Sequence, residues 1–282
     1  MAEIHSMIDS LAADFAPGSV VLAGAGFGGM GSLTLEVLAC LRRCDVLVFD
    51  ALVDESILAL ANRAAKRIPM GKRAGGDSSH QDDINLCLLE QAQRGLRVLR
   101  LKGGDPGVFG RGAEEAAFLL KRGIDCRWLP GVSAALGCGA AAMIPLTHRG
   151  LARSVSFVTG QQMGGQQIGG EGSRHWQQLL AQGNTLVFYM GANQAGLISA
   201  SLQLAGASAA LPCALVRDGG RPSQQLKFCH LKDLSTAASS LKGDGPCLML
   251  VGEVCAVGEE LNQLRAELLN GVDLCAVEVV YG

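Results

Sequence analysis

Aromatic residues are scarce in this chain, at 4 per cent of its 282 residues. Proteins that bind single-stranded nucleic acid stack bases on aromatic rings, so this scarcity argues against such a platform. Charges nearly cancel, since 24 Lys and Arg accompany 26 Asp and Glu, for a net charge of −2. Such a chain has no global basic field for nucleic acid or an acidic membrane surface. An anionic ligand must therefore meet a local cluster of Lys and Arg.

Long apolar runs are also missing. No uninterrupted apolar stretch reaches the roughly 20 residues that a membrane-spanning helix needs. The first five residues, MAEIH, lack the basic and then apolar pattern of a secretory signal. We therefore expect a cytoplasmic protein with no membrane partner.

The ten cysteines form no metal-binding pattern. Cys40 and Cys44 lie one helical turn apart instead of forming a Cys-x-x-Cys pair, and no His lies beside them, so we expect no bound metal. Others lie in apolar segments, as Cys87, Cys126 and Cys213 do. Free cysteine usually serves as a small core residue, and we expect most of these to be reduced.

The chain is long enough for one large domain or two moderate ones. Apolar segments alternate with glycine turns, which predicts strand-turn-helix units and a largely parallel sheet. We expect an N-terminal arm over residues 1–18, whose first 17 residues form either a short helix or a loose segment. An α/β domain over 19–152, a second α/β domain over 153–256 and a C-terminal extension over 257–282 are expected to follow. Ligands of such folds bind at the carboxyl ends of the strands.

The individual elements follow from apolar periodicity and turn residues. Strands are predicted over residues 19–23, 46–49, 66–70, 96–101, 126–129, 154–159, 185–190, 213–216 and 246–251. Helices are predicted after Ser32, over residues 80–93, through Leu120, starting within residues 130–135, up to Ala205 and over 259–269. Ser32 is the expected cap of the first of these helices. Residues 160–172, rich in Gly and Gln, are expected to form a mobile loop.

The most distinctive stretch is RLKGGDPGVFGRGAEE, residues 100–115. An apolar strand passes through a Gly-Gly-Asp-Pro turn and opens into a helix. Gly103 and Gly104 let backbone approach a bound molecule closely, while Asp105 and the helix N-terminus supply polar groups. We interpret the turn as a ligand site, with an ordinary strand-to-helix connection as the alternative.

A second glycine loop follows the first predicted strand. Gly24-x-Gly26-x-x-Gly29 matches the dinucleotide-binding fingerprint, and Asp50 falls where a ribose-binding acid is expected. A nicotinamide or flavin oxidoreductase is therefore one hypothesis. Glycine loops after a first strand occur in many α/β folds, so this motif alone does not identify an oxidoreductase.

Seven motifs, in their order and spacing, resemble the uroporphyrinogen-III C-methyltransferases of the tetrapyrrole methylase family over roughly residues 19–255. They are the loop at Gly24, VFDALV at 48–53, GKRAG at 71–75, the stretch 100–115, PGVS at 130–133, IPLTHR at 144–149 and FYMG at 188–191. The resemblance displaces the oxidoreductase hypothesis. It implies two α/β domains of the tetrapyrrole methylase type, with S-adenosylmethionine in the cleft between them as methyl donor, and a homodimer.

The resemblance also implies a reaction. Uroporphyrinogen III receives two methyl groups in succession, giving precorrin-1 and then precorrin-2, the branch point towards sirohaem, cobalamin and haem d1. Two molecules of S-adenosylhomocysteine leave. A methylase of a later corrin intermediate would share the fold and remains an alternative.

Site residues are carried over by motif position. The resemblance implies that the cofactor is bound by Gly103, Gly104, Asp105, Val108, Ser133, Ala134, Met190 and Gly219. It implies Asp50 as proton acceptor, Lys72 as proton donor, and Arg111, Glu114 and Arg149 in substrate binding or catalysis. A helix cap is the structural alternative for Asp50, and an i,i+3 surface pair is the alternative for Arg111 with Glu114.

Uroporphyrinogen carries eight carboxylates, which this chain must meet locally. We expect one cleft to be lined by Lys72, Arg73, Arg111, His148, Arg149 and Arg153. Arginine suits this role because its guanidinium pairs with carboxylate through two parallel hydrogen bonds.

The glycine loop departs from the family pattern, which is usually GAGPGDPG. Here Phe27, Gly29 and Met30 replace Pro, Asp and Pro. Loss of the proline leaves the loop less pre-organised, and loss of the acid removes a polar group. A binding protein that has lost its activity is therefore a third alternative.

Overall fold

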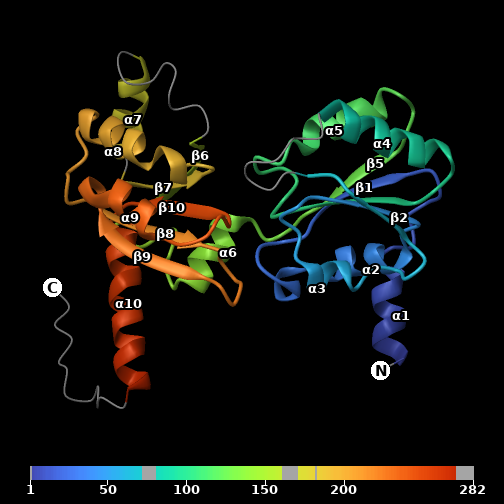
Figure 1. Cartoon of the computed structure of the whole chain (residues 1–282), viewed down its shortest axis with the longest axis horizontal. Helices are drawn as coiled ribbons and strands as arrows, with labels where there is room; N and C mark the ends of the chain where they lie inside the picture. The colour runs from blue at the N-terminus through green and yellow to red at the C-terminus, as the bar shows by residue number, and fades with distance from the viewer. Residues whose placement is uncertain (1, 72–80, 161–170, 182, 271–282) are drawn as a thin grey trace. The chain divides into compact units, whose positions relative to one another are not determined.

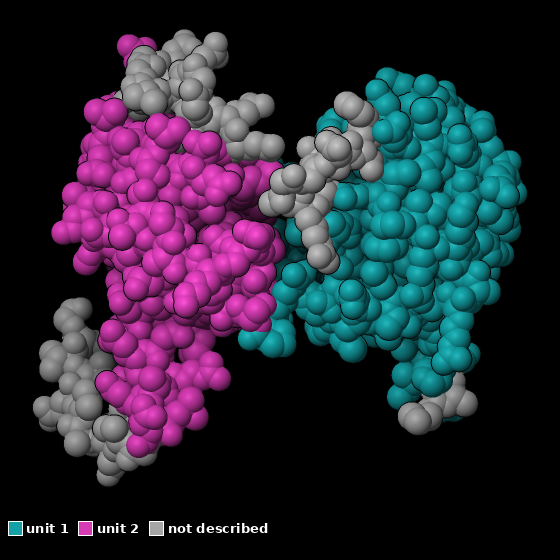
Figure 2. Space-filling view, viewed as in Figure 1, with its two compact units in different colours: residues 1–137, 220–222 teal, residues 138–219, 223–282 magenta. Residues whose placement is uncertain are grey.

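The computed structural model describes residues 2–71, 81–160, 171–181 and 183–270. The chain divides into two units: unit 1 holds residues 1–137 and 220–222, and unit 2 holds residues 138–219 and 223–282 (Figure 2). Each unit has its own five-stranded sheet flanked by helices (Figure 1). The expected two α/β parts are therefore confirmed. The finer domain boundaries at residues 18, 152 and 256 stay predictions.

Every strand pairing described in the unit 1 sheet is parallel, as predicted for this part of the chain. Its strands are β1 (Val20–Gly24), β2 (Val46–Phe49), β3 (Lys66–Pro69), β4 (Val98–Lys102) and β5 (Cys126–Leu129), in the order β3-β2-β4-β1-β5. The register places Val48 opposite Arg100 and Gly24 opposite Lys102. The carboxyl ends of parallel strands share one edge, so the loops that follow β1, β2, β4 and β5 meet there.

Helices cover both faces of this sheet (Figure 1). One face packs against α1 (Ala2–Ser10), α2 (Leu35–Arg43) and α3 (Glu55–Leu58), and the other against α4 (Gln81–Gln93) and α5 (Gly112–Leu120). Side chains alternate accordingly, since Val21 joins the first core and Leu22 the second. A parallel sheet buried on both faces explains the nearly continuous apolar strands.

The unit 2 sheet is mixed. Its strands β6 (Ser154–Thr159), β7 (Asn184–Tyr189), β8 (Pro212–Arg217), β9 (Gln225–His230) and β10 (Cys247–Val251) lie in the order β6-β7-β10-β8-β9. The β6–β7 pairing is parallel and the other three are antiparallel. The helices of this part are α6 (Ala134–Ala141), which crosses the boundary at residue 137, α7 (Glu171–Ala181), α8 (Ala195–Leu204), α9 (Leu234–Ser240) and α10 (Val254–Leu269). Short 3-10 turns cover Met30–Ser32, Ala192–Gln194 and Leu231–Asp233.

One core of unit 2 lies between its sheet and α7, α8 and α9. Trp176 of α7 is buried against Phe188 of β7, with ring centroids 5.8 Å apart. Strand β9 and helices α7 and α9 of this unit were not predicted from the sequence, nor was α3 of unit 1, whereas the last helix extends the predicted 259–269 segment towards its N-terminus. The predicted loop at 160–172 falls mostly outside the described residues.

The cap of α2 differs from the expectation. Thr34 occupies the cap, and its Oγ1 accepts the Val37 backbone N–H at 3.3 Å. Ser32 instead donates its hydroxyl to the Phe27 carbonyl at 2.6 Å. The prediction of Ser32 as cap was wrong because this hydroxyl closes the glycine loop.

The nine described cysteines are free, and five of them are buried. Burial raises the pKa of both Cys44 and Cys138 to about 12, which disfavours the reactive thiolate. No group of three potential metal ligands occurs among the described residues. None of the described helices is both long and apolar enough to cross a membrane.

Candidate active site

Three loops meet at the carboxyl edge of the unit 1 sheet. They follow the adjacent strands β1, β4 and β5 and comprise residues 24–26, 103–105 and 131–133. Gly104 donates its N–H to the Gly26 carbonyl at 2.8 Å, and Gly26 returns a bond of 3.1 Å to the Gly104 carbonyl. This two-way bridge holds the first loop against the second.

Gly24 makes the closest approach between these loops. A Cβ at this position would lie 2.4 Å from the Gly104 carbonyl oxygen and 2.6 Å from the Cα of Gly131. Both neighbours are backbone, so no side-chain rotation could relieve the contact. The fingerprint glycine is therefore explained by loop packing without a pyrophosphate.

Asp105 ties the second loop to the third. One carboxylate oxygen accepts the Gly107 N–H at 2.8 Å, and the other accepts the Gly131 N–H at 3.1 Å. The structure thus gives Asp105 a part in organising the loops. Its predicted contact with a cofactor stays a prediction.

The Cα of Gly104 has space on the side where a side chain would lie. A Cβ there would meet only the Ala134 backbone nitrogen within 4 Å, at 3.9 Å, and the residue has a positive φ of 72°. Gly103 is half-buried beside Leu52, while Ser133 is buried where α6 begins. The predicted binding residues of unit 1 thus share this edge, and Val108 follows in the same turn.

Left-handed backbone recurs at predicted site residues. Arg111 has a φ of 56° and Met190 a φ of 54°, and Asp218, with a φ of 52°, directly precedes Gly219. Outside glycine such conformations cost of the order of 1–3 kcal/mol and concentrate at functional sites. The strain supports a functional reading of these turns, each within its own unit.

Asp50 directly follows β2 at the same sheet edge. Its N–H donates to the Leu101 carbonyl at 3.1 Å, and its carboxylate forms an ion pair with the guanidinium of Arg100 on β4. The Asp50 side chain is 26% exposed, whereas that of Arg100 is 1% exposed. The Asp50 carboxylate is paired with a buried arginine on its inner side and is partly exposed, so it is accessible to a ligand at the sheet edge.

The ion pair continues into the interior. Glu115 of α5, fully buried, accepts hydrogen bonds from Lys102 Nζ at 2.7 Å and from Gln81 Nε2 at 3.2 Å. Arg100 Nε lies 3.5 Å from the same Glu115 oxygen. We name Asp50, Arg100, Lys102 and Glu115 the buried ionic cluster. Its two cations and two carboxylates balance one another.

Within this cluster, Lys102 has a shifted pKa. Desolvation lowers the pKa of Lys102, the Arg100 charge lowers it further, and the Glu115 carboxylate opposes both effects. Taking ions from water costs several kcal/mol each, which their mutual attraction offsets only in good geometry. Removing one member would therefore leave an uncompensated charge inside unit 1.

Arg111 and Glu114 form a surface pair. Arg111 donates to both Glu114 oxygens, from Nε at 3.0 Å and from Nη2 at 2.6 Å, and each side chain is 55% exposed. The hydrogen bonds from Arg111 lower the pKa of Glu114. The i,i+3 pair named as the structural alternative is thus present, and a role in substrate binding stays a prediction.

The remaining predicted residues lie outside the described residues or belong to unit 2. Lys72 and Arg73 lie outside the described residues. In unit 2, Arg149 and His148 are exposed on a turn closed by two 3.0 Å backbone bonds between His148 and Ala152, and Arg153 follows. A Cβ at Gly219 would lie 2.5 Å from Cys138 Sγ.

The sequence-based interpretation missed three members of the buried ionic cluster as site residues, namely Arg100, Lys102 and Glu115. The signal was present, because Arg100 and Lys102 alternate on a strand of apolar neighbours and so share one face. On a sheet covered on both faces, that face must be buried. Two buried cations require buried partners.

Phe27, which replaces the family proline, has a defined place in unit 1. A Cβ at Gly137 would lie 2.0 Å from the Phe27 ring, and one at Gly220 would lie 2.7 Å from it. The aromatic ring therefore lies against two residues without side chains. The departure in the loop is accommodated by local packing.

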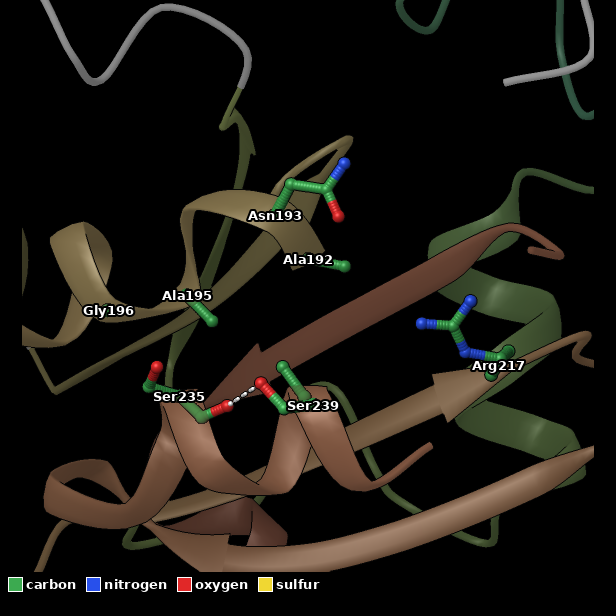
Figure 3. A pocket seen from close by; sticks show the side chains of 8 residues that line it. Ala192, Asn193, Ala195, Gly196, Arg217, Ser235 and Ser239 are labelled. Carbon is green, nitrogen blue, oxygen red and sulfur yellow. Dashed lines mark hydrogen bonds between the residues drawn. The ribbon is translucent and has the colours of Figure 1, made fainter. Parts of the chain in front are cut away.

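A separate cavity of about 300 Å³ lies within unit 2 (Figure 3). It is lined by Ala192, Asn193, Ala195, Gly196, Arg217, Ser235, Ala238 and Ser239. Arg217 donates to the carbonyls of Gly243 at 2.6 Å and Gly245 at 3.0 Å, which binds its guanidinium to the chain itself. None of the predicted site residues lines this cavity.

These features define an α/β protein of two units whose parallel sheet ends in packed glycine loops beside a buried ionic cluster. The family model of the Tetrapyrrole (Corrin/Porphyrin) Methylases matches residues 19–235, well over half of the chain. The chain belongs to this family.

Curated relatives agree with this assignment. The siroheme synthase of Salmonella typhimurium is 44% identical over 245 residues, which cover 87% of this chain and 52% of that protein. The siroheme synthase of Citrobacter koseri gives the same identity and coverage. The chain spans about half the length of these relatives.

This chain also matches solved structures of similar proteins, and the match extends over nearly the whole length of those proteins. A uroporphyrin-III-C-methyltransferase from Thermus thermophilus has a TM-score of 0.72 and 35% identity, covering 86% of this chain and 98% of that one. The same enzyme complexed with S-adenosylhomocysteine gives 0.70 and 35%, covering 85% and 99%. A cobalt precorrin-4 methyltransferase, at 22% identity and a TM-score of 0.72 over 84% and 96%, shares the fold.

Proposed function

We propose that this chain is an S-adenosylmethionine-dependent C-methyltransferase that converts uroporphyrinogen III to precorrin-2 by two successive methylations. The observation that carries the proposal is the Asp50 carboxylate, paired with buried Arg100 at the edge where the glycine loops converge. The named activity of the Thermus thermophilus relative and its complex with S-adenosylhomocysteine support the choice of substrate and cofactor.

The residues at the edge fit the proposed cofactor. A Cβ at Gly104 would have wide clearance, so a ligand group can approach the Cα of this residue. We propose that the cofactor is held by Gly103, Gly104, Asp105, Val108, Ser133 and Ala134 of unit 1 and by Met190 and Gly219 of unit 2. S-adenosylmethionine supplies an electrophilic methyl group on a sulfonium, so the protein needs no covalent nucleophile.

The chain's contribution is alignment and charge. Holding a pyrrole carbon in line with the methyl group can lower the barrier by several kcal/mol. The pyrrole becomes cationic as it attacks, and Asp50 stabilises that charge and accepts the proton lost when the ring rearranges. Lys72 is the proposed proton donor.

Substrate recognition falls to exposed cations. We propose that Arg111 and Arg149 pair with the carboxylates of the tetrapyrrole, with Glu114 orienting Arg111 through its two hydrogen bonds. Guanidinium suits this task through bidentate pairing. The strained φ of 56° at Arg111 is consistent with a side chain whose direction matters.

The decisive experiment is anaerobic incubation with uroporphyrinogen III and S-adenosylmethionine, followed by product mass. A gain of two methyl groups per tetrapyrrole is expected. Methylation of a later corrin intermediate but not of uroporphyrinogen III would replace the substrate. Calorimetry that showed NAD binding without S-adenosylhomocysteine binding would refute the proposal. Cofactor binding without turnover would identify a binding protein.

We further propose a cytoplasmic homodimer whose product feeds sirohaem, cobalamin or haem d1 formation. The resemblance to the family supports the dimer, and the names of the curated relatives favour sirohaem. Light scattering coupled to gel filtration should give twice the chain mass of 29.3 kDa.

A further inference from the structure

We propose that Arg100 and Glu115 are positioning residues that hold the Asp50 carboxylate at the sheet edge for proton transfer. The inference rests on the proposed function, in which Asp50 accepts the proton. It assigns a task to the members of the buried ionic cluster that lie beneath the surface, since the Arg100 side chain is 1% exposed and that of Glu115 is 0% exposed.

Arg100 fixes Asp50 from below. Its Nη2 pairs with Asp50 Oδ1, while its Nη1 donates to the Met70 carbonyl at 3.4 Å. The guanidinium thus spans the ends of two neighbouring strands, β2 and β3. With 1% of its side chain exposed, Arg100 has little freedom to leave this position.

Glu115 faces Arg100 in turn, through an ion pair and not a hydrogen bond. One Glu115 oxygen lies 3.5 Å from Arg100 Nε and accepts the bonds from Lys102 and Gln81. These partners come from β4 and α4, while Glu115 belongs to α5. The cluster therefore joins the sheet to both helices on this face and ends on the one carboxylate that reaches the surface.

Stability alone does not account for this arrangement. Replacing a buried ion pair by apolar residues of similar volume is often neutral or stabilising. The same face of the sheet carries Val48 and Val98, beside and before Arg100 in the fold. A run of apolar residues that changes to charges next to Asp50 fits a positioning role.

A double-mutant cycle tests whether Arg100 acts through Asp50. We expect Arg100→Met to lower kcat by about 30- to 100-fold with KM changed less than about threefold, as for an interaction used in the transition state. In the Asp50→Asn background the same change should cost less than about threefold, because residues that act as a unit are not additive. Arg100→Lys, which keeps the charge, should recover part of kcat.

Glu115→Gln gives a second, independent measurement. It keeps the shape of the side chain and removes the charge that faces Arg100, so kcat should fall by about 5- to 10-fold at nearly constant KM. Arg97→Met is the matched control. Arg97 precedes the same strand and pairs with Asp45 at 3.3 Å, away from the site edge. The kcat of the Arg97→Met variant should stay within about twofold of the wild-type value.

Full additivity of the Arg100→Met and Asp50→Asn losses in kcat would overturn the proposal, as would an equal loss in Arg97→Met. Urea unfolding curves are also measured for the four proteins of the cycle. The urea midpoints should be non-additive whatever the reaction, and additive midpoints would refute the Arg100–Asp50 linkage. If the wild-type chain gave no methylated product but the urea midpoints were non-additive, the proposed function would be refuted and the Arg100–Asp50 linkage would stand.

Discussion

The Gly131 backbone N–H donates to the Asp105 carboxylate at 3.1 Å, so one side chain joins the loops that follow β4 and β5. The second Asp105 oxygen accepts the Gly107 N–H at 2.8 Å. Asp105, a candidate cofactor-binding residue, thus also holds together the loops that surround it.

Asp105→Asn should loosen both loops. Asparagine offers one acceptor oxygen and places an amide against the second N–H, so a partly buried donor loses its partner. We expect a loss of about 1–2 kcal/mol in the free energy of unfolding and weaker S-adenosylhomocysteine binding. Urea unfolding and calorimetry measure the two.

Asp14→Asn is the control, because Asp14 makes an exposed pair with Arg127 at 2.6 Å. Such pairs contribute about 0–1 kcal/mol. An equal loss of stability in both variants would remove the special role of Asp105 in the loops.

Gly24→Ala tests the packing of the glycine loops. The added methyl would lie 2.4 Å from the Gly104 carbonyl oxygen, and backbone must move to admit it. Overpacking of this kind costs about 1–3 kcal/mol, and displaced loops should bind S-adenosylhomocysteine at least about tenfold more weakly. Gly31→Ala is the matched control, since a Cβ there meets nothing within 4 Å. Unchanged affinity in Gly24→Ala would show that these loops do not form the cofactor site.

Asp50→Asn should slow methyl transfer while leaving S-adenosylhomocysteine affinity largely intact. Removing a general base typically lowers the rate by about 100- to 10,000-fold. Single-turnover methylation and calorimetry separate the two effects. Asp45→Asn is the control, because Asp45 precedes β2 as Asp50 follows it and also pairs with an arginine. Equal losses of rate and affinity in Asp50→Asn would give Asp50 a structural role.

Much of the site edge could be predicted because it depends on local signals. Glycines after β1 and β4 and the strand-end position of Asp50 are visible in the sequence, and parallel strands bring such ends together. Burial of charge is different, because it depends on which helix covers a face. The pairing of Glu115 with Lys102 requires the packing of α5 on β4, which no local pattern encodes.

Unit 2 was harder to predict for a similar reason. Strand β9 is mostly half-buried at the edge of its sheet, so its apolar alternation is weak.

The cap of α2, in unit 1, was misassigned between two hydroxyl residues two positions apart. The Phe27 carbonyl accepts the Ser32 hydroxyl, which leaves Thr34 as the residue that caps the helix. Competition for a tertiary partner is invisible in a local motif.

The contact between Phe27 and Gly137 yields a prediction about the departure from the family loop. Gly137 lies within α6, where alanine is intrinsically more stable than glycine by about 1 kcal/mol. In the wild-type chain, however, a Cβ there would lie 2.0 Å from the ring, so Gly137→Ala should destabilise unit 1. In a Phe27→Ala background the clash is absent and the helix preference remains. Gly137→Ala should then raise the urea midpoint instead of lowering it, and a lower midpoint in both backgrounds would mean that the ring does not determine the glycine at this position.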